Sequence, residues 1–172
     1  MRAIYCAVCI VAGAMFLFEH QSQAAANTVF GNMMYHTSCP YIAEAVTLVG
    51  GEGVKRNGRL HVSLYYEGHS VYGDFNHDGL RDAAVTIGES QGGSDDEVSL
   101  AFLINDGQML VHRQSAYLGD SAIIRSLSLR DDTVIVNMLI HQEGDCQAGP
   151  TKRVKYAYTY GGSGRWVKGT PL

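Results

Sequence analysis

The sequence predicts a mostly β fold (all-β or α+β): a single antiparallel, hairpin-built domain with at most one short helix. From about residue 43 onward, apolar residues alternate with polar ones in short segments that are rich in β-branched and aromatic residues. Clusters of glycine and aspartate separate these segments and mark turns. No segment sustains the 3.6-residue period of an amphipathic helix. Short strands separated by turn signals therefore predict a meander of hairpins.

The expected strands follow one another with turn signals between them, such as "NDG" at 105–107 and "RDD" at 130–132. The best helix candidate is "PYIAEAV" (40–46), which is short and has Pro40 at a position that suits the first helical turn. The predicted strands lie at 45–49, 60–66, 83–87, 98–104, 109–114, 122–130, 133–141 and 152–160.

Two of these segments show the alternation most clearly. Within 153–160, valine and tyrosine occupy one face, and the other face carries arginine, lysine and threonine. Within 123–129, Ile123, Leu127 and Leu129 align on one face, against serines on the other. A half-buried antiparallel sheet has this pattern, with one face on the core and the other in water.

Residues 1–26 are predicted to be a signal peptide. Arg2 supplies the positive n-region, an unbroken apolar run follows, and small residues end the segment, with Ala24 and Ala26 at the −3 and −1 positions of a cleavage site. Cleavage after Ala24 fits nearly as well. The apolar run is shorter than the about 20 residues that a membrane span needs, and an uncleaved anchor is the alternative. We therefore expect one β-rich domain, 27–172, that is secreted or periplasmic and is not held in a membrane.

The charge of the chain argues against two classes of partner. The formal net charge is −4, and removal of the signal peptide leaves it unchanged because Arg2 and Glu19 are lost together. Binding to nucleic acid needs a basic stripe that neutralises phosphates. Binding to a membrane surface needs a polybasic cluster. The sequence has neither feature, so we expect neither partner.

Two cysteines remain after the signal peptide, Cys39 and Cys146. In an exported protein an even pair predicts a disulfide. The bond would close a loop of about 107 residues, for which the chain-entropy model gives roughly 4–5 kcal/mol of stabilisation. The alternative is two free buried thiols. The pair lacks the close C-x-x-C spacing of a redox or zinc site, so it suggests no catalysis.

The stretch "YGDFNHDGLRDAAV" (72–85) is where the residue types converge on one chemistry. Oxygen ligands recur at positions 1, 3 and 5 of a loop, and Gly79 at position 6 permits a sharp turn. Odd spacing lets a curled chain point these side chains inward while Phe75 and His77 point away. Oxygen ligands of this kind suit Ca²⁺; the alternative is a polar β-turn without metal, in which Arg81 partly relieves the repulsion between carboxylates. The expected calcium ligands are Asp74, Asn76, Asp78, the carbonyl oxygen of Leu80, and Asp82.

The loop is not an EF-hand, because position 12 is Val85 instead of a bidentate glutamate and the flanking segments are strand-like. It resembles the short D-x-[DN]-x-D-G-x-x-D calcium loops of FG-GAP and VCBS-type repeats, which join two strands. A propeller of such repeats needs roughly four or more blades, and this chain carries a single copy. The resemblance therefore implies a strand-to-strand calcium loop without a propeller.

A broader resemblance covers most of the chain after the signal peptide. A group of small secreted bacterial proteins carries a "GDLNGDG-x-x-DAAV" segment, then an "LGD" strand and a "PT-x-RV" strand. The resemblance implies a shared fold and a calcium-type loop, and it supplies no activity. Members often show "CCPT" where this chain has "CQAGPT", which limits how far their disulfide pattern carries over. The similar segments here are "VTLVGGEG", "YGDFNHDGLRDAAV", "YLGDSAIIRSLSL", "VIVNMLIHQEGD" and "GPTKRVKYAYTY".

The segment "GESQG" (88–92) matches the G-x-S-x-G pattern of a nucleophile elbow and follows a predicted strand. The order serine, acid, histidine is met by Ser90, Asp131 and His141. The residues after the pattern predict a loop and then a strand, whereas an elbow requires a helix, and no parallel βαβ pattern surrounds it. A serine hydrolase that uses Ser90 is therefore only a remote alternative, and we expect no enzyme.

The sequence thus favours an exported, non-enzymatic domain whose fold is stabilised by one Ca²⁺ ion and one disulfide. A second hypothesis is a protein-binding module, of inhibitor or adhesin type, that presents the loops at 88–97 and 143–150 to a protein partner. Both hypotheses place the protein in the periplasm or outside the cell.

Overall fold

The computed structural model describes residues 29–39, 45–58, 60–93, 96–146, 149–161 and 170–171. The predicted signal peptide and most of the predicted helix at 40–46 lie outside these residues. The prediction of a mostly β fold is confirmed, because strands that pair antiparallel make up most of the described chain. The strands are β1 (Met34–Tyr35), β2 (Val46–Thr47), β3 (Glu52–Asn57), β4 (Leu60–Gly73), β5 (Asp82–Ser90), β6 (Glu97–Asn105), β7 (Leu110–Asp120), β8 (Ile123–Arg130), β9 (Thr133–Ile140), β10 (Lys152–Thr159) and β11 (Thr170–Pro171).

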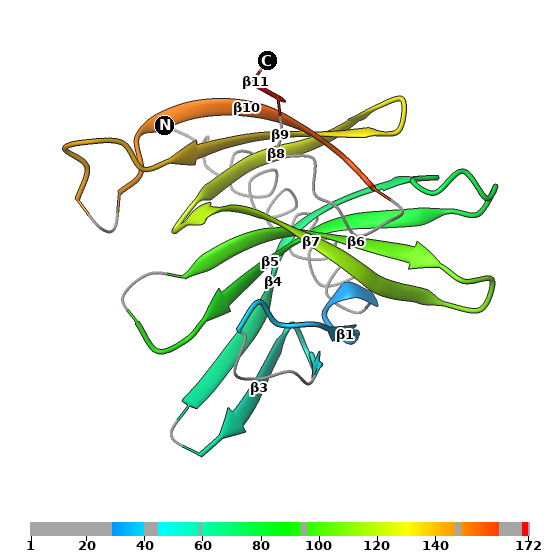
Figure 1. Cartoon of the computed structure of the whole chain (residues 1–172), viewed down its shortest axis with the longest axis horizontal. Coiled ribbons are helices and arrows are strands. Elements are labelled where there is room, and N and C mark those ends of the chain that lie inside the picture. The colour runs from blue at the N-terminus through cyan, green and yellow to red at the C-terminus, as the bar shows by residue number, and fades with distance from the viewer. Residues whose placement is uncertain are drawn as a thin grey trace, which may run out of the picture.

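The strands form two main sheets and a short two-stranded one. The larger sheet has five strands in the order β3-β4-β5-β6-β7, so each strand pairs with its neighbour along the chain. The second sheet has four strands in the order β11-β10-β9-β8, and β1 pairs with β2. Figure 1 shows the four-stranded sheet lying over the five-stranded sheet, with β1 near the opposite face. Both main sheets are therefore built from successive hairpins, as the turn signals predict.

Strand β5 is covered on both of its faces. Every residue from Asp82 to Glu89 is buried, because side chains that alternate along the strand enter two different layers. Ala83 and Val85 contact the layer formed by β1, β2 and the residues around them, whereas Ala84 contacts the four-stranded sheet. The expected pattern of one core face and one water face therefore fails for this strand.

The hydrophobic core has two halves, one on each face of the five-stranded sheet. In the first half, Tyr35 is held in place by its hydroxyl group, which donates to the Phe30 carbonyl at 2.9 Å. In the second half, side chains from β8, β9 and β10 meet those of the larger sheet. The first half contains Phe30, Tyr35, Cys39, Val46, Leu48, Leu64, Tyr66, Ala83, Val85, Ile87, Ala101 and Leu103. The second contains Phe75, Ala84, Val98, Leu100, Phe102, Ile104, Ala116, Leu118, Ala122, Ile124, Val134, Val136, Met138 and Tyr158.

The predicted phase of β8 is wrong at its start. Ile123 is 39% exposed, whereas Ile124 is 8% exposed and packs in the core. The register with β9 shifts between Ile124 and Ser126, so a β-bulge lets both Ile124 and Leu127 contact the core. Strict alternation cannot anticipate such an extra residue, so the prediction that Ile123 faces the core is wrong.

The predicted phase of β10 is confirmed. Its valine and tyrosine face packs on the second half of the core, with Tyr158 fully inside it. Strand β3, in contrast, was not predicted. Its sequence is polar, it contains Gly53, and it is mostly exposed at the edge of the sheet, so it carries no apolar alternation.

Candidate functional site

The predicted calcium loop joins the end of β4 to the start of β5, as a strand-to-strand connection. At Gly73, an added Cβ would lie 3.0 Å from the Phe75 ring and 3.2 Å from Leu129, so a larger residue would displace them. Gly79 has a φ of 83°, in the left-handed region that glycine adopts without strain. His77 has a φ of 60°, which is uncommon for a residue other than glycine. The loop is therefore tightly curled.

The carboxylate of Asp74 lies at the centre of the hydrogen bonds of this loop. The N–H of Asp78 donates to Asp74 Oδ1 (3.1 Å), and the N–H of Gly79 donates to Asp74 Oδ2 (2.9 Å). Asn76 Nδ2 donates to Asp78 Oδ2 (2.7 Å), and Asn76 Oδ1 accepts the Asp78 N–H (3.3 Å). The N–H of Leu80 donates to Asp78 Oδ1 (2.8 Å). The structure therefore brings the residues at positions 1, 3 and 5 of the predicted site together.

Asp82, the predicted ligand at position 9, has a second role. It is fully buried, and its Oδ2 and Oδ1 accept the N–H groups of Phe75 and Asn105, both at 2.8 Å. The Phe75 ring points into the core, where it meets Phe102 edge to face with centroids 5.2 Å apart. Asp82 thus links the loop to the end of β6, a role that the ligand pattern did not indicate.

The side chains of His77 and Arg81 reach outward from the loop to other parts of the molecule. His77 Nδ1 lies 3.6 Å from Asp132 Oδ2, in the turn between β8 and β9. The Arg81 guanidinium lies 4.1 Å from the centroid of the Tyr72 ring, a cation–π contact. Arg81 thus contacts an aromatic ring. In the alternative of a metal-free turn, the same side chain has to relieve the repulsion between the carboxylates of the loop.

The chemistry of the loop fits Ca²⁺. Each carboxylate oxygen keeps a lone pair beside the N–H group that it accepts, and Ca²⁺ takes roughly six to eight oxygens from carboxylates, amides, carbonyls and water. Among the described residues, no three His, Cys, Asp or Glu side chains are grouped so that they could hold a metal ion. Two carboxylates and an amide do meet here, those of Asp74, Asp78 and Asn76. Calcium bound at this loop would therefore need carbonyl or water oxygens as well.

The two cysteines differ in their surroundings. Cys39 is buried, and its N–H donates to Thr37 Oγ1 at 2.9 Å. Cys146 is exposed in the segment after β9. Both are free thiols in the structure, and the exposure of Cys146 does not match the alternative of two buried thiols. The disulfide between them stays a prediction.

The local geometry around Ser90 is not that of a nucleophile elbow. Ser90 ends β5 and has Ser63 of β4 as its Cα partner. The chain continues into β6, which pairs antiparallel with β5, whereas an elbow leads from a strand into a helix. Asp131 lies in the turn between β8 and β9, and His141 follows β9. The residues of the hydrolase alternative therefore sit at the ends of three different strands.

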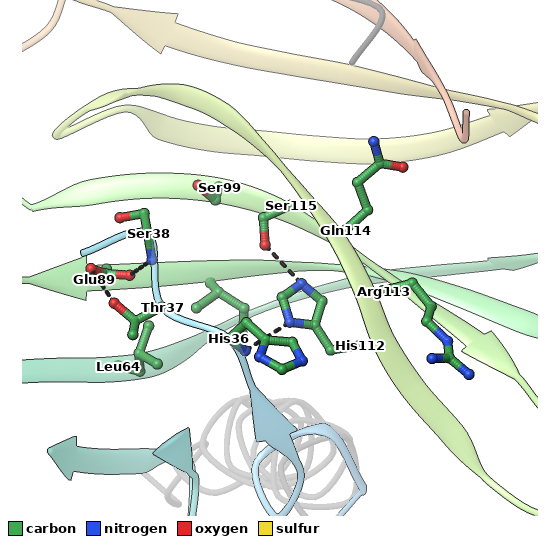
Figure 2. A pocket seen from close by; sticks show the side chains of 11 residues that line it. His36, Thr37, Ser38, Leu64, Glu89, Ser99, His112, Arg113, Gln114 and Ser115 are labelled. Atoms are coloured by element: carbon green, nitrogen blue, oxygen red, sulfur yellow. Dashed lines mark hydrogen bonds between the residues drawn. The ribbon is translucent and has the colours of Figure 1, made fainter. Parts of the chain in front are cut away.

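A pocket of about 460 Å³ lies on the face of the five-stranded sheet that the N-terminal layer covers. Residues 36–39, which follow β1 and which we call the strap, cross this face beside Glu89 and His112 (Figure 2). Sequence reasoning missed this site, because 76 positions separate His36 from His112. Only the strand register brings these residues together.

A serine and a histidine meet in the pocket without forming a catalytic pair. His112 Nε2 lies 2.8 Å from Ser115 Oγ, and His112 Nδ1 accepts the N–H of His36 at 2.9 Å. Because a backbone N–H can only donate, the proton of the neutral ring is on Nε2. Burial and the nearby His36 lower the pKa of His112 to about 4, so the ring is neutral at pH 7. Its Nε2 donates to Ser115 and has no lone pair to accept the serine proton.

Comparisons with family models, curated proteins and solved structures returned no match to this chain. Within the described residues, no helix combines the length and the apolar character that crossing a membrane requires. The function must therefore be inferred from the residues themselves.

Proposed function

We propose that the protein is an exported, non-enzymatic β domain whose fold is stabilised by one Ca²⁺ ion in the loop at 74–82. The observation that carries this proposal is the curl of the loop, in which the N–H groups of Asp78 and Gly79 close around the Asp74 carboxylate. Carboxylates held together in this way repel one another unless a cation lies among them. A calcium ion bound by Asp74, Asn76 and Asp78 would convert this repulsion into attraction.

Calcium would act by holding three turns together at one end of the molecule. Asp82 already links the loop to Asn105 at the end of β6, and His77 approaches Asp132 between β8 and β9. A metal that binds only the folded form stabilises it by RT ln(1 + [Ca²⁺]/Kd). Extracellular calcium modules have a Kd of roughly 10⁻⁴–10⁻³ M. Calcium at about ten times Kd would then contribute about 1.4 kcal/mol.

Thermal unfolding with and without calcium tests this proposal. Wild-type protein should melt roughly 3–6 °C higher in calcium at about ten times Kd than in EDTA, because each kcal/mol shifts the Tm of a domain of this size by about 2–4 °C. In Asp78→Ala the loop loses a carboxylate that also accepts the Leu80 N–H, and the calcium-dependent shift should disappear.

Asp106→Ala is the matched control for that experiment. Asp106 lies in the turn between β6 and β7, where its Oδ1 accepts the N–H groups of Gln108 and Met109, both at 3.0 Å. This variant should lower the Tm by the same amount in calcium and in EDTA. Equal Tm values of the wild type in both conditions, or a full calcium shift in Asp78→Ala, would contradict the proposal.

We further propose that Cys39 and Cys146 form a disulfide in the exported protein. The support is the even cysteine pair that remains after the predicted signal peptide, together with the stabilisation that a long closed loop provides. Peptide mapping of the unreduced protein should find a cross-linked peptide that carries both residues. If both cysteines react with iodoacetamide before reduction, the disulfide is absent and this part of the proposal is wrong.

The loop at 143–150 supports a second candidate function, a protein-binding module. The Asp145 carboxylate accepts the N–H groups of Gln142 (3.0 Å) and Thr151 (2.9 Å) and the Thr151 hydroxyl (2.7 Å). These bonds hold the two ends of the loop together at Gln142 and Thr151, and a loop whose ends are already fixed loses less entropy on binding. The other predicted binding loop, 88–97, is shorter than expected, because it shares residues with β5 and β6.

A pull-down from the native cell envelope or medium tests the second candidate. A protein recovered by the wild type and lost with Asp145→Ala would support a binding role for the loop. Recovery of the same protein by Asp145→Ala, in which the base of the loop is opened, would contradict it.

A further inference from the structure

The pocket beside the strap has the size and the mixture of groups of a small-ligand site. Its volume of about 460 Å³ falls within the roughly 300–1,000 Å³ that is typical of ligand pockets. Leu64 and Ile87 give it an apolar floor, and Ser99 and Ser115 add hydroxyl groups to its lining. Ser115 Oγ accepts the His112 Nε2–H, so its own proton is free to donate to a ligand.

Glu89 places a carboxylate in the wall of this pocket, with only 6% of the residue exposed. Its oxygens accept hydrogen bonds from the Thr37 hydroxyl (2.8 Å), the Ser38 N–H (2.8 Å) and the Gln91 amide (3.1 Å). These donors fix the carboxylate and tie the strap to β5, but they are neutral and leave its charge in place. A buried charge is costly unless an opposite charge lies beside it.

A second carboxylate lies next to Glu89 on the neighbouring strand. Glu97 of β6 is the Cα partner of Glu89, and like charges opposite one another destabilise an antiparallel pair. Ser38 and Gln91 bridge the two residues: the Ser38 hydroxyl donates to Glu97 Oε2 at 2.7 Å, and Gln91 Nε2 lies 3.4 Å from the same oxygen. These bridges are neutral as well, so the negative charge of Glu97 lies next to that of Glu89, although Glu97 itself does not line the pocket.

The basic side chains of the pocket, His36, His112 and Arg113, lie on the side away from Glu89 (Figure 2). His112 is neutral, and both of its ring nitrogens are engaged. In the part of the chain that the structure describes, His, Cys, Asp and Glu side chains form no group of three that could hold a metal ion. The charge pattern therefore suits an organic cation better than a metal.

We propose that this pocket binds a small organic cation with a primary ammonium group. The ammonium group lies against Glu89, beside which Glu97 adds a second negative charge, and a short aliphatic part contacts Leu64 and Ile87. An ammonium group brings one positive charge and three N–H donors, which match the free lone pairs of the Glu89 carboxylate and the hydroxyl of Ser99. This site is separate from the calcium loop and does not depend on it.

A titration followed by ¹H–¹⁵N NMR tests the proposal with three probes of equal chain length: n-butylammonium, 1-butanol and butyrate. We expect n-butylammonium to bind at least about tenfold more tightly than 1-butanol, because only the former pairs with the buried charge of Glu89, and butyrate to bind most weakly. The shifted amides should lie around Glu89 on β5 and Ser99 on β6. Equal affinity for the ammonium and the alcohol, or shifts only outside the pocket, overturns the proposal.

Substitutions separate the charge of the pocket from its shape. Glu89→Gln should weaken n-butylammonium binding at least about tenfold and leave 1-butanol binding unchanged, whereas the exposed Glu143→Gln should change neither. Because Glu89→Gln also affects the strap, a second variant, Ser99→Leu, is needed. It fills the pocket without touching the hydrogen bonds of Glu89, and it should weaken the binding of both n-butylammonium and 1-butanol. Wild-type affinity for n-butylammonium in either Glu89→Gln or Ser99→Leu overturns the proposal.

Discussion

Two partly or fully buried titratable residues affect how the stability of the protein depends on pH. Burial and the charge of Asp96 raise the pKa of Glu67 to about 7. Burial and His36 lower the pKa of His112 to about 4. Both shifts favour the neutral form in the folded protein. Ionisation of Glu67 and protonation of His112 are therefore both destabilising.

The His112→Asn variant should lose less stability than the wild type as the pH falls. The pKa of His112 is about 4 in the folded protein, against the usual 6.5 of a histidine. Its stabilising contribution is therefore complete above 6.5 and is lost as the pH falls toward 4. Asparagine keeps an acceptor for the His36 N–H but does not titrate. Urea titrations at about pH 7 and about pH 4.5 should show a smaller pH effect in the variant, by on the order of 2 kcal/mol. An unchanged pH effect would contradict the burial argument.

Glu67→Gln should stabilise the protein at high pH and not at low pH. The pKa of Glu67 is raised from 4.5 to about 7, so its contribution is present below 4.5 and is lost as the pH rises through about 7. Glutamine has the same shape and stays neutral. In urea titrations the variant should match the wild type near pH 4.5 and exceed it near pH 8. The exposed Glu52→Gln serves as control, and an equal gain at both pH values in Glu67→Gln would refute this explanation.

At the scale of elements, strands with one solvent face are the ones that the sequence predicts best. Strand β10 shows its core face directly, because polar residues alternate with the tyrosines. Strand β5 has both faces covered, so its residues do not alternate between apolar and polar, and the sequence does not reveal that its second face is buried. Strand β3 is polar and mostly exposed, and β8 changes phase at a bulge. Edge strands and bulges depend on partners elsewhere in the chain, which local periodicity does not contain.

The site residues that the sequence predicts are those that lie close together along the chain. The oxygen donors of the loop at 74–82 lie within one short stretch, so their spacing alone shows that a curled chain can bring them together. The pocket is assembled from the strap, β4, β5, β6 and β7. Glu89 and Glu97 become neighbours only through the β5–β6 register, and His112 reaches the strap only because β7 follows β6 in the sheet.

Gly88→Ala tests the close packing between β4 and β5. An added Cβ at Gly88 would overlap the ring of Tyr65, its Cα partner on β4. Overpacking of this kind costs about 1–3 kcal/mol, which urea unfolding at neutral pH would measure. In a Tyr65→Ala background the same substitution should cost much less, because the ring is gone. A Gly88→Ala variant as stable as the wild type would show that β4 and β5 are not packed in this way.

At the scale of the whole molecule, the predicted calcium loop lies where the two main sheets and their hairpin turns meet. Asp82 contacts the end of β6 through Asn105, and His77 contacts the turn between β8 and β9 through Asp132. Leu129 of β8 packs close to Gly73 at the start of the loop. A metal bound here would therefore stabilise contacts between the sheets as well as the loop itself.

Titration of Ca²⁺ into the metal-free protein, followed by ¹H–¹⁵N NMR, tests the central claim most directly. The account predicts one site with a Kd of roughly 10⁻⁴–10⁻³ M. The largest shifts should fall on the N–H groups of Asp78 and Gly79, which donate to Asp74, and a smaller one on Asn105, which donates to Asp82. Unchanged amides throughout the loop at 74–82 in millimolar calcium, or shifts confined to other parts of the chain, would contradict it.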